Sequence, residues 1–320
     1  MSNHINSPIL LIGSGPMAVE YAKVLIALKT PFITIGRGEQ SASMYKEKTG
    51  CEVITGGLLA YLNTKPLFPS FCIIATGVES LTETTKELLR VGVKNILCEK
   101  PGGLFRQELE DVCQLAQEKN ATLLIAYNRR FYSSVYKAQE IIEQDGGVIS
   151  FNFEFTEWAH LIEPLEKGAF VKERLFLSNS SHVADLAFYL GGKPKKLSCF
   201  TAGGLSWHPS ASMFTGAGVS DRGALFSYNA NWNAPGRWAV EILTANHRLY
   251  LKPMEKLQIQ KKGSVVVEDV QIDNKLDTDF KPGLYRMVNE FCQKNNSKFC
   301  TIEEQLMVYD FYCQIANYEL

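Results

Sequence analysis

The sequence predicts an α/β domain with a parallel sheet, followed by an α+β domain with a mostly antiparallel sheet. The chain has 320 residues, which exceeds the length of a usual single domain. Short apolar runs alternate with helical patterns up to about residue 126, as in a parallel sheet. From about residue 148 most segments have strand character instead. We therefore expect one domain over residues 1–126 and a second over residues 127–320.

Charge and hydropathy give no sign of a nucleic-acid or membrane partner. Lys and Arg total 33 and Asp and Glu total 34, so the net charge is −1. No apolar run is long enough to span a bilayer. The N-terminus MSNHINS has neither the basic start nor the apolar core of a signal peptide. We expect a cytoplasmic protein that binds neither nucleic acid nor a membrane.

The spacing of cysteines and histidines predicts no metal site, although a site formed by residues distant in the sequence stays open. The eight cysteines are scattered, and several lie within apolar patterns, which is typical of reduced core residues. No C-x-x-C pair appears, and the five histidines are far apart in sequence.

The first strand leads into a glycine turn of the dinucleotide-binding (Rossmann) type. Ile9–Ile12 is a short apolar run, typical of a strand buried on both faces. Gly13, Gly15 and Ala18 match G-x-G-x-x-G/A, which combines a tight turn, close approach to a pyrophosphate and close packing of helix on strand. The free N–H groups of the following helix would stabilise such an anion, although a turn that binds nothing stays open. The cofactor-binding residues expected here are Gly13, Gly15, Pro16 and Met17.

The loop after the second strand indicates which nicotinamide cofactor is bound. Phe32–Ile35 is the strand, and Arg37 follows it where an acidic residue would bind a ribose 2′-hydroxyl and an arginine would pair with a 2′-phosphate. Glu39 lies two residues on, so the loop favours NADP and keeps NAD open. A solvated surface arginine is the alternative.

Two later strands of the first domain also end in candidate site residues. The apolar run 71–75 ends at Thr76 and a glycine, which suits a backbone that passes close to a cofactor. The run 94–98 ends in Glu99, Lys100 and Pro101. Ligands of open α/β sheets bind beyond the carboxyl ends of strands, so Lys100 is well placed for chemistry, although a charged turn is equally open.

The remaining segments follow the same patterns. Helices are expected over 82–91, 107–119, 183–190, 283–294 and 302–315. Strands are expected over 122–126, 148–156, 195–201, 224–232, 238–243, 248–251, 257–260 and 265–270.

With these motifs in that order, the chain resembles the glucose-fructose oxidoreductase, inositol dehydrogenase and MocA (Gfo/Idh/MocA) family. The resemblance rests on the glycine turn, on Glu99-Lys100-Pro101 and on 127–131, YNRRF, and it extends over most of the chain. It implies a Rossmann domain plus an α+β domain with a large, mostly antiparallel, open-faced sheet.

The resemblance also implies roles for the residues at the two strand ends. Lys100 would lie near the nicotinamide and the reacting hydroxyl, and Glu99 and Asn128 would help to bind the cofactor. Tyr127 would line the substrate site, and Pro101 matches a proline often preceded by a cis bond. Two arginines that follow, Arg129 and Arg130, are expected to be structural and to bridge the domains.

His182 matches the family's catalytic histidine at the start of a helix. An imidazole can exchange a proton with a substrate hydroxyl near neutral pH. The chain departs from the family pattern because Ser178 stands where an aspartate is common. Asn179 or Asp185 is then expected to orient the ring, and a histidine that only caps a helix stays open.

The second domain is rich in groups that suit a sugar. Aromatic faces cover sugar C–H groups and arginine pairs with carboxylate or phosphate. Packing on the sheet face or at a subunit interface is equally open for these rings. The substrate residues expected are Tyr127, Trp158, Asn179, Trp207, Trp232 and Arg237.

The function expected is hydride transfer between NAD(P) and a hydroxyl or ketone of a sugar, nucleotide sugar or cyclitol. Segments 153–158 and 281–285 also resemble members linked to surface-polysaccharide pathways. A non-catalytic NAD(P)-sensing regulator and a biliverdin reductase-like enzyme are the alternatives. A homo-dimer or homo-tetramer is expected, because an open-faced sheet usually needs a partner surface.

Overall fold

The computed structural model describes residues 8–64 and 69–319, which form two compact units. Unit 1 comprises Met1–Asn128 and Leu276–Leu306, and unit 2 comprises Arg129–Lys275 and Met307–Leu320. The two predicted domains therefore exist, but a single boundary near residue 126 does not divide them. The segment 276–306 belongs to unit 1, because its strand pairs with the sheet of that unit and its helix Leu284–Cys292 packs on the helix Pro16–Ala27.

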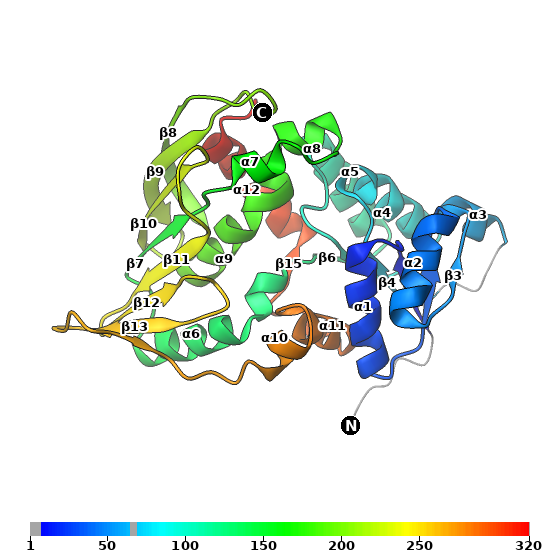
Figure 1. The fold of residues 1–320 in the computed structure, drawn as a ribbon, viewed down its shortest axis with the longest axis horizontal. Coiled ribbons are helices and arrows are strands. Elements are labelled where there is room, and N and C mark those ends of the chain that lie inside the picture. Colours follow the sequence, from blue (N-terminus) through cyan, green and yellow to red (C-terminus); the bar gives the residue numbers. More distant parts are fainter. Residues whose placement is uncertain (1–7, 65–68, 320) are drawn as a thin grey trace. The chain divides into compact units, whose positions relative to one another are not determined.

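Unit 1 contains a seven-stranded sheet in the order β15-β6-β5-β4-β1-β2-β3, of which Figure 1 labels β15, β6, β4 and β3. All neighbouring strands run parallel except β15, which pairs antiparallel with β6 at the edge. The order reverses between β1 and β4, as in doubly wound nucleotide-binding sheets. The strands are β1 Ile9–Ile12, β2 Phe32–Ile35, β3 Val53–Ile54, β4 Phe71–Ile74, β5 Asn95–Cys98, β6 Thr122–Ile125 and β15 Cys300–Thr301.

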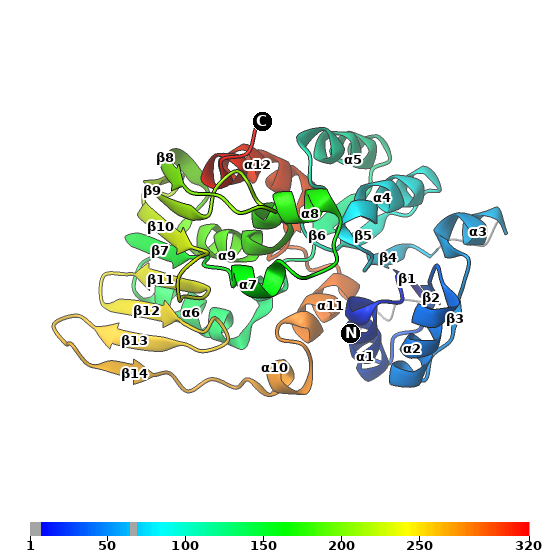
Figure 2. The same cartoon turned by 45° about the horizontal axis from the view of Figure 1, so that its top comes forward.

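Helices cover both faces of this sheet, with α1 and α2 on one face and α4 and α5 on the other (Figure 2). The apolar strands β1 and β4 are fully buried as a result. The helices of unit 1 are α1 Pro16–Ala27, α2 Glu39–Thr49, α3 Gly57–Asn63, α4 Leu81–Arg90, α5 Arg106–Glu118, α10 Lys275–Asp279 and α11 Leu284–Cys292. Helix α12 Ile302–Ala316 begins in unit 1 and continues into unit 2.

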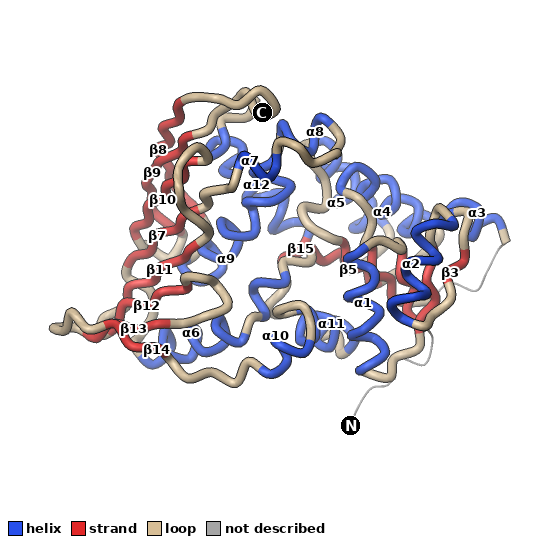
Figure 3. Tube along the Cα trace, in the orientation of Figure 1, coloured by secondary structure: helices blue, strands red, loops and turns tan. Residues whose placement is uncertain are grey.

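Unit 2 contains an eight-stranded, mostly antiparallel sheet in the order β14-β13-β12-β11-β7-β10-β9-β8 (Figure 3). Only β7 and β10 pair in parallel. The expected open-faced α+β architecture is confirmed. The strands are β7 Ser150–Glu154, β8 Pro194–Ala202, β9 Met213–Ser220, β10 Leu225–Asn231, β11 Ala239–Leu243, β12 His247–Leu251, β13 Gln258–Lys261 and β14 Val267–Asp269.

The strand β9 was not expected from the sequence, because glycines interrupt its alternating pattern. Gly216 and Gly218 lie opposite Tyr228 and Phe226 of β10. A Cβ atom at Gly216 would be 2.4 Å from the Tyr228 hydroxyl, and one at Gly218 would be 2.6 Å from the Phe226 ring. The glycines are therefore needed to make room for the aromatic side chains of the neighbouring strand.

Helix α9 covers the inner face of this sheet. Its Phe188 ring packs against the rings of Phe151, Phe153 and Phe226, with centroids 5.2–6.1 Å apart. The outer face is open, and Phe200 is 69% exposed there. Homo-oligomer formation stays a prediction. The helices of unit 2 are α6 Ser133–Gln144, α7 Ala159–Ile162, α8 Ala169–Glu173, a π-helical turn Phe176–Ser180 and α9 Ser181–Gly191.

No helix formed by residues 8–64 and 69–319 is both long and apolar enough to cross a membrane.

The last residue of α9 tests how tightly this helix packs on the sheet. A Cβ atom at Gly191 would be 2.2 Å from the Phe151 ring, so Gly191→Ala forces the helix and the strand apart. We expect a loss of about 1–3 kcal/mol in the free energy of unfolding, measured by urea denaturation. In a Phe151→Leu background the same substitution should cost less, since the ring is gone. Equal costs in both backgrounds would contradict this packing.

Candidate active site

The glycine turn of unit 1 opens onto a pocket of about 570 Å³ at the point where strand order reverses. Residues after β1, β2 and β4 line it, including four of the residues expected to bind a cofactor: Gly13, Gly15, Arg37 and Thr76. Pro16 and Met17 begin α1 immediately beside it. The position is the one in which doubly wound sheets bind their ligands.

The two glycines of the turn have different surroundings. Gly13 has φ +121°, and a Cβ there would be 2.4 Å from the carbonyl oxygen of Ala75 on the neighbouring strand. Gly15, the N-cap of α1, has φ −82°, and a Cβ there would meet no atom within 4 Å. Protein packing therefore leaves open space in front of the first N–H groups of α1. A pyrophosphate fits this space, because those N–H groups stabilise anions.

Arg37 is exposed and makes no ion pair within the described parts of the chain. It lines the same pocket, two residues before α2 begins at Glu39. Ser41 also lines the pocket, and its hydroxyl is 2.8 Å from that of Ser14. A guanidinium beside a helix N-terminus suits a phosphate group.

At the carboxyl end of β5, Glu99 and Lys100 follow the last buried residue, Cys98. The Tyr21 hydroxyl on α1 donates a 2.7 Å hydrogen bond to the Glu99 carboxylate. Burial raises the pKa of Glu99, and the Tyr21 hydrogen bond and the Lys100 charge oppose that shift. The peptide bond between Lys100 and Pro101 is cis, as expected.

Beyond β6, Tyr127 and Asn128 are both buried. The Asn128 amide donates a 2.9 Å hydrogen bond to the carbonyl oxygen of Pro282, in the loop before α11. Asn128 therefore fastens the returning C-terminal segment to the end of β6, in addition to any role toward a cofactor.

In unit 2, His182 occupies the first turn of α9 and is 7% exposed. The π-helical turn Phe176–Ser180 lies directly before this helix, and such turns are frequent at functional sites. Ser178, which replaces the expected aspartate, donates through its hydroxyl to the carbonyl oxygen of Val171. Asp185, one of the two residues expected to orient the ring, accepts bonds from Nε and the Nη2 group of Arg130 at 2.9 and 2.5 Å. Arg130 is therefore structural, through an ion pair within unit 2.

The sequence analysis missed Glu157, the buried carboxylate of this region. It is 1% exposed, and its Oε1 accepts bonds from the Asn179 amide at 2.9 Å and the Ser180 hydroxyl at 2.6 Å. Arg237 donates to its other oxygen at 3.3 Å. Burial raises the pKa of Glu157, and these donors oppose the shift. The available signal was the position of Glu157 in an alternating pattern, because it stands where the series Phe151, Phe153 and Phe155 would continue.

Three of the expected substrate residues meet around this carboxylate: Trp158, Asn179 and Arg237. The Arg237 guanidinium lies 4.7 Å from the Trp158 ring and 4.7 Å from the Trp238 ring. Trp238 in turn lies 4.6 Å from the Arg129 guanidinium and 6.1 Å from the His182 ring. Burial lowers the pKa of Arg129. Trp158 is 44% exposed, so this cluster reaches the surface of unit 2.

The other two expected aromatic residues belong to a separate cluster. Trp232 is 2% exposed and donates its indole N–H to the carbonyl oxygen of Phe155. It stacks on Trp207 at 6.1 Å and contacts His208 at 4.6 Å. Trp232 is thus buried in the core of unit 2, and a role toward substrate stays a prediction. The sequence could not distinguish the two cases, since a tryptophan suits a core as well as a sugar site.

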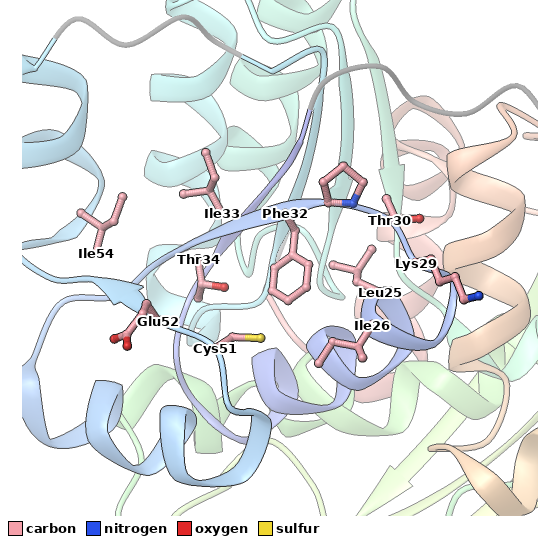
Figure 4. A pocket seen from close by; sticks show the side chains of 11 residues that line it. Leu25, Ile26, Lys29, Thr30, Phe32, Ile33, Thr34, Cys51, Glu52 and Ile54 are labelled. Carbon is pink, nitrogen blue, oxygen red and sulfur yellow. The ribbon is translucent and has the colours of Figure 1, made fainter.

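A second pocket, of about 580 Å³, lies near the amino-terminal end of β2 (Figure 4). Its lining includes the apolar side chains of Leu25, Ile26, Phe32, Ile33 and Ile54. It lies toward the opposite end of β2 from the glycine turn, and none of the expected site residues lines it.

The described residues contain no group of His, Cys, Asp and Glu side chains arranged to hold a metal ion. All eight cysteines lie in the described chain outside any disulfide, and five of them are buried.

Comparison with known proteins establishes the fold. No family model and no curated protein matches the sequence. Solved structures match over nearly the whole chain. An oxidoreductase from Agrobacterium radiobacter in complex with NAD⁺, L-tartaric acid and magnesium is 15% identical, with 95% of this chain and 94% of that chain covered and a TM-score of 0.77.

Two further structures give the same result. A UDP-N-acetylglucosamine 3-dehydrogenase from Acidithiobacillus ferrooxidans is 16% identical, covers 98% of this chain and 97% of its own, and has a TM-score of 0.75. A levoglucosan dehydrogenase in complex with NADH and levoglucosan is 18% identical and has a TM-score of 0.77, with 96% of this chain and 95% of that chain covered. The chain therefore shares the two-domain fold of these oxidoreductases, which is the fold that the resemblance to the Gfo/Idh/MocA family implies.

The Trp232 cluster contains a buried histidine whose titration can be measured. His208 lies between the Ala211 carbonyl at 2.7 Å and the Tyr318 hydroxyl at 2.8 Å, and burial lowers its pKa to about 4. The neutral ring is favoured on folding, so stability is lost as pH falls from 6.5 toward 4. The loss expected at pH 4 is about 3 kcal/mol.

The His208→Asn variant lacks the titrating ring, so its free energy of unfolding should fall by about 3 kcal/mol less between pH 7 and pH 4. Urea denaturation at the two pH values measures this. His160→Asn, at an exposed position, serves as the control. If His208→Asn and the unmodified protein lose the same stability over this range, the buried neutral state of His208 is wrong.

Proposed function

We propose that the protein is an NAD(P)-dependent oxidoreductase that oxidises a hydroxyl of a sugar, nucleotide sugar or cyclitol, or reduces the corresponding ketone. The observation that carries the proposal is the pocket at the β1/β4 strand reversal, in which Gly15 leaves open space before the N-terminus of α1. The fold shared with dehydrogenases supports it.

The residues present fit a dinucleotide. The N–H groups after Gly15 would bind the pyrophosphate, Thr76 and Ala75 would lie along the pocket wall, and Arg37 would pair with a 2′-phosphate. NADP is therefore favoured, although two of the three structures named above hold NAD⁺ or NADH. When bound, the nicotinamide supplies or accepts the hydride.

Lys100 would stabilise negative charge on the reacting oxygen. An ammonium is a strong donor to a developing alkoxide, and such donors act best when they are pre-organised. Glu99, the preceding residue, is held by the Tyr21 hydroxyl, so the end of β5 is fixed by α1, the same helix that begins at the glycine turn.

His182 would accept the hydroxyl proton during oxidation and return it during reduction. A histidine suits this exchange because its ordinary pKa is close to neutral. Glu157, through Asn179 and Ser180, holds the turn directly before His182, and Trp238 packs beside the ring. A place in surface-polysaccharide metabolism stays a prediction.

Removing the Arg37 side chain tests both the cofactor site and its preference. Arg37→Ala should weaken NADPH binding by about 10- to 100-fold, the range for a lost hydrogen-bonded charge pair, and leave NADH binding little changed. Isothermal titration of the cofactor-free protein with each form measures this. Gly15→Val, which fills the open space at the α1 N-terminus, should weaken both cofactors. No binding of any form by the unmodified protein would overturn the proposal.

Replacing Lys100 tests the catalytic role. Lys100→Met should lower kcat by about 10²- to 10³-fold, because a charged donor to the reacting oxygen is lost, while NADPH binding is retained. Turnover is followed by nicotinamide absorbance with levoglucosan, UDP-N-acetylglucosamine and myo-inositol as trial substrates.

Lys94→Met, at an exposed lysine at the start of the same strand segment, is the matched control and should keep full turnover. Undiminished turnover in Lys100→Met would exclude the assigned role. Tight NADPH binding with no turnover on a broad panel would instead favour the non-catalytic regulator.

A further inference from the structure

Arg237 is a half-exposed cation held between two aromatic rings. It lies in the loop between β10 and β11, and its side chain is 45% exposed. Its guanidinium lies 4.7 Å from the rings of Trp158 and Trp238. Rings on the guanidinium limit its rotamers and remove water from it. The remaining hydrogen-bonding edge is therefore pre-organised before any ligand arrives.

Trp158 is itself fixed. Its indole N–H donates a 3.0 Å hydrogen bond to the carbonyl oxygen of Gly236, the residue before Arg237. A Cβ at Gly236 would be 2.3 Å from the Glu154 carboxylate and 2.9 Å from the Thr156 methyl group, so the loop runs close to β7. The loop, the ring and the guanidinium thus form one rigid group.

Glu157 fixes the arginine from the protein side. One carboxylate oxygen accepts hydrogen bonds from the Asn179 amide and the Ser180 hydroxyl. The other accepts a hydrogen bond from the Arg237 guanidinium at 3.3 Å. Within residues 8–64 and 69–319, this is the only side-chain hydrogen bond of the Arg237 guanidinium. A guanidinium has five N–H donors, so most of them stay available to a ligand.

This group lies next to the proposed catalytic histidine. Trp238 is a neighbour of both side chains, at 4.7 Å from the Arg237 guanidinium and 6.1 Å from the His182 ring. Arg237 and His182 thus have one indole as a common neighbour, so an anion bound by Arg237 would lie in the same region of unit 2 as His182.

The surrounding charges are already matched in pairs. Glu157 forms an ion pair with Arg237, and Glu154 forms an ion pair with Lys252 at 3.3 Å. Arg129, buried beside Trp238, has Glu255 nearby. These pairs leave no surplus of positive charge around Arg237 that would attract every anion. Selectivity for a ligand must then come from the arrangement of the N–H donors on the Arg237 guanidinium. A planar fork of N–H donors matches the two oxygens of a carboxylate or phosphate.

We propose that Arg237 binds an oxyanion of the substrate, a carboxylate or a phosphate, and that Glu157 is its positioning residue. This inference rests on the proposed function, since it assigns the part of the substrate that is bound beside His182. It narrows the substrate class to acidic sugars or nucleotide sugars.

Matched pairs of probes test the inference by isothermal titration into the NADPH-saturated protein. Glucuronate against glucose isolates the carboxylate, and UDP-N-acetylglucosamine against N-acetylglucosamine isolates the diphosphate. We expect the anionic member of one pair to bind at least about tenfold more tightly, and the pair that shows this identifies the source of the oxyanion.

Three variants locate the effect. Arg237→Ala should abolish the preference for the anionic member, and Arg237→Lys should restore only part of it, since an ammonium lacks the planar fork. Glu157→Gln should weaken binding of the anionic probe several-fold and leave binding of the neutral probe unchanged. The amide can still accept a hydrogen bond from Asn179 or Ser180, but it no longer forms an ion pair with the guanidinium. Lys196→Ala, an exposed cation on β8, is the control and should change nothing.

Each result decides the inference. No preference in either pair, with NADPH still bound, overturns it and leaves the proposed function standing. A preference that survives Arg237→Ala with the thermal midpoint unchanged overturns the assignment to Arg237. If Glu157→Gln loses the same affinity for the anionic and the neutral probe of a pair, Glu157 has a general structural role, and the positioning role is overturned. Failure of NADPH itself to bind overturns the proposed function instead.

Discussion

The reversal of strand order between β1 and β4 is the constraint on which the nucleotide side of the molecule depends. Two parallel strands whose crossovers leave in opposite directions leave a crevice beyond their carboxyl ends. Gly13 allows the chain to turn there against Ala75, and Gly15 keeps the space before α1 clear. The same helix carries Tyr21, which fixes Glu99 at the end of β5. One helix therefore links the cofactor pocket to the lysine proposed for catalysis.

In unit 2 a single buried carboxylate has the corresponding organising role. Burial of a charged glutamate costs folding free energy unless several hydrogen-bond donors satisfy its carboxylate. The Glu157 carboxylate accepts hydrogen bonds from Asn179, Ser180 and Arg237. Those donors come from the turn before α9 and from the loop before β11. The requirement to satisfy one charge thus holds together the segment that carries His182 and the loop that carries the Trp158–Arg237–Trp238 group. It also gives a physical reason why Ser178 need not be acidic for the turn to be ordered.

Apolar runs and glycine spacing were sufficient to predict β1, β2, β4, β5 and β6, since each is buried on both faces or nearly so. They failed at β9, where glycines make room for the rings of Tyr228 and Phe226. They also failed for 276–306, because pairing of β15 with β6 joins residues far apart in sequence. Trp232 was expected at the substrate site and lies in the core, since composition does not show which partner a ring will find.

The sequence by itself determined the two-domain class, the turn at Gly13 and Gly15, and the chemical types at Lys100, Arg37 and His182, because these depend on local periodicity and on the properties of single residues. Only the tertiary structure decided that Glu157 is a shared acceptor, that Asp185 serves Arg130, and that Arg237 lies between two tryptophans. Burial and hydrogen-bond partners arise from contacts between segments distant in sequence, and the free energy of a buried charge is set by those contacts rather than by its neighbours along the chain.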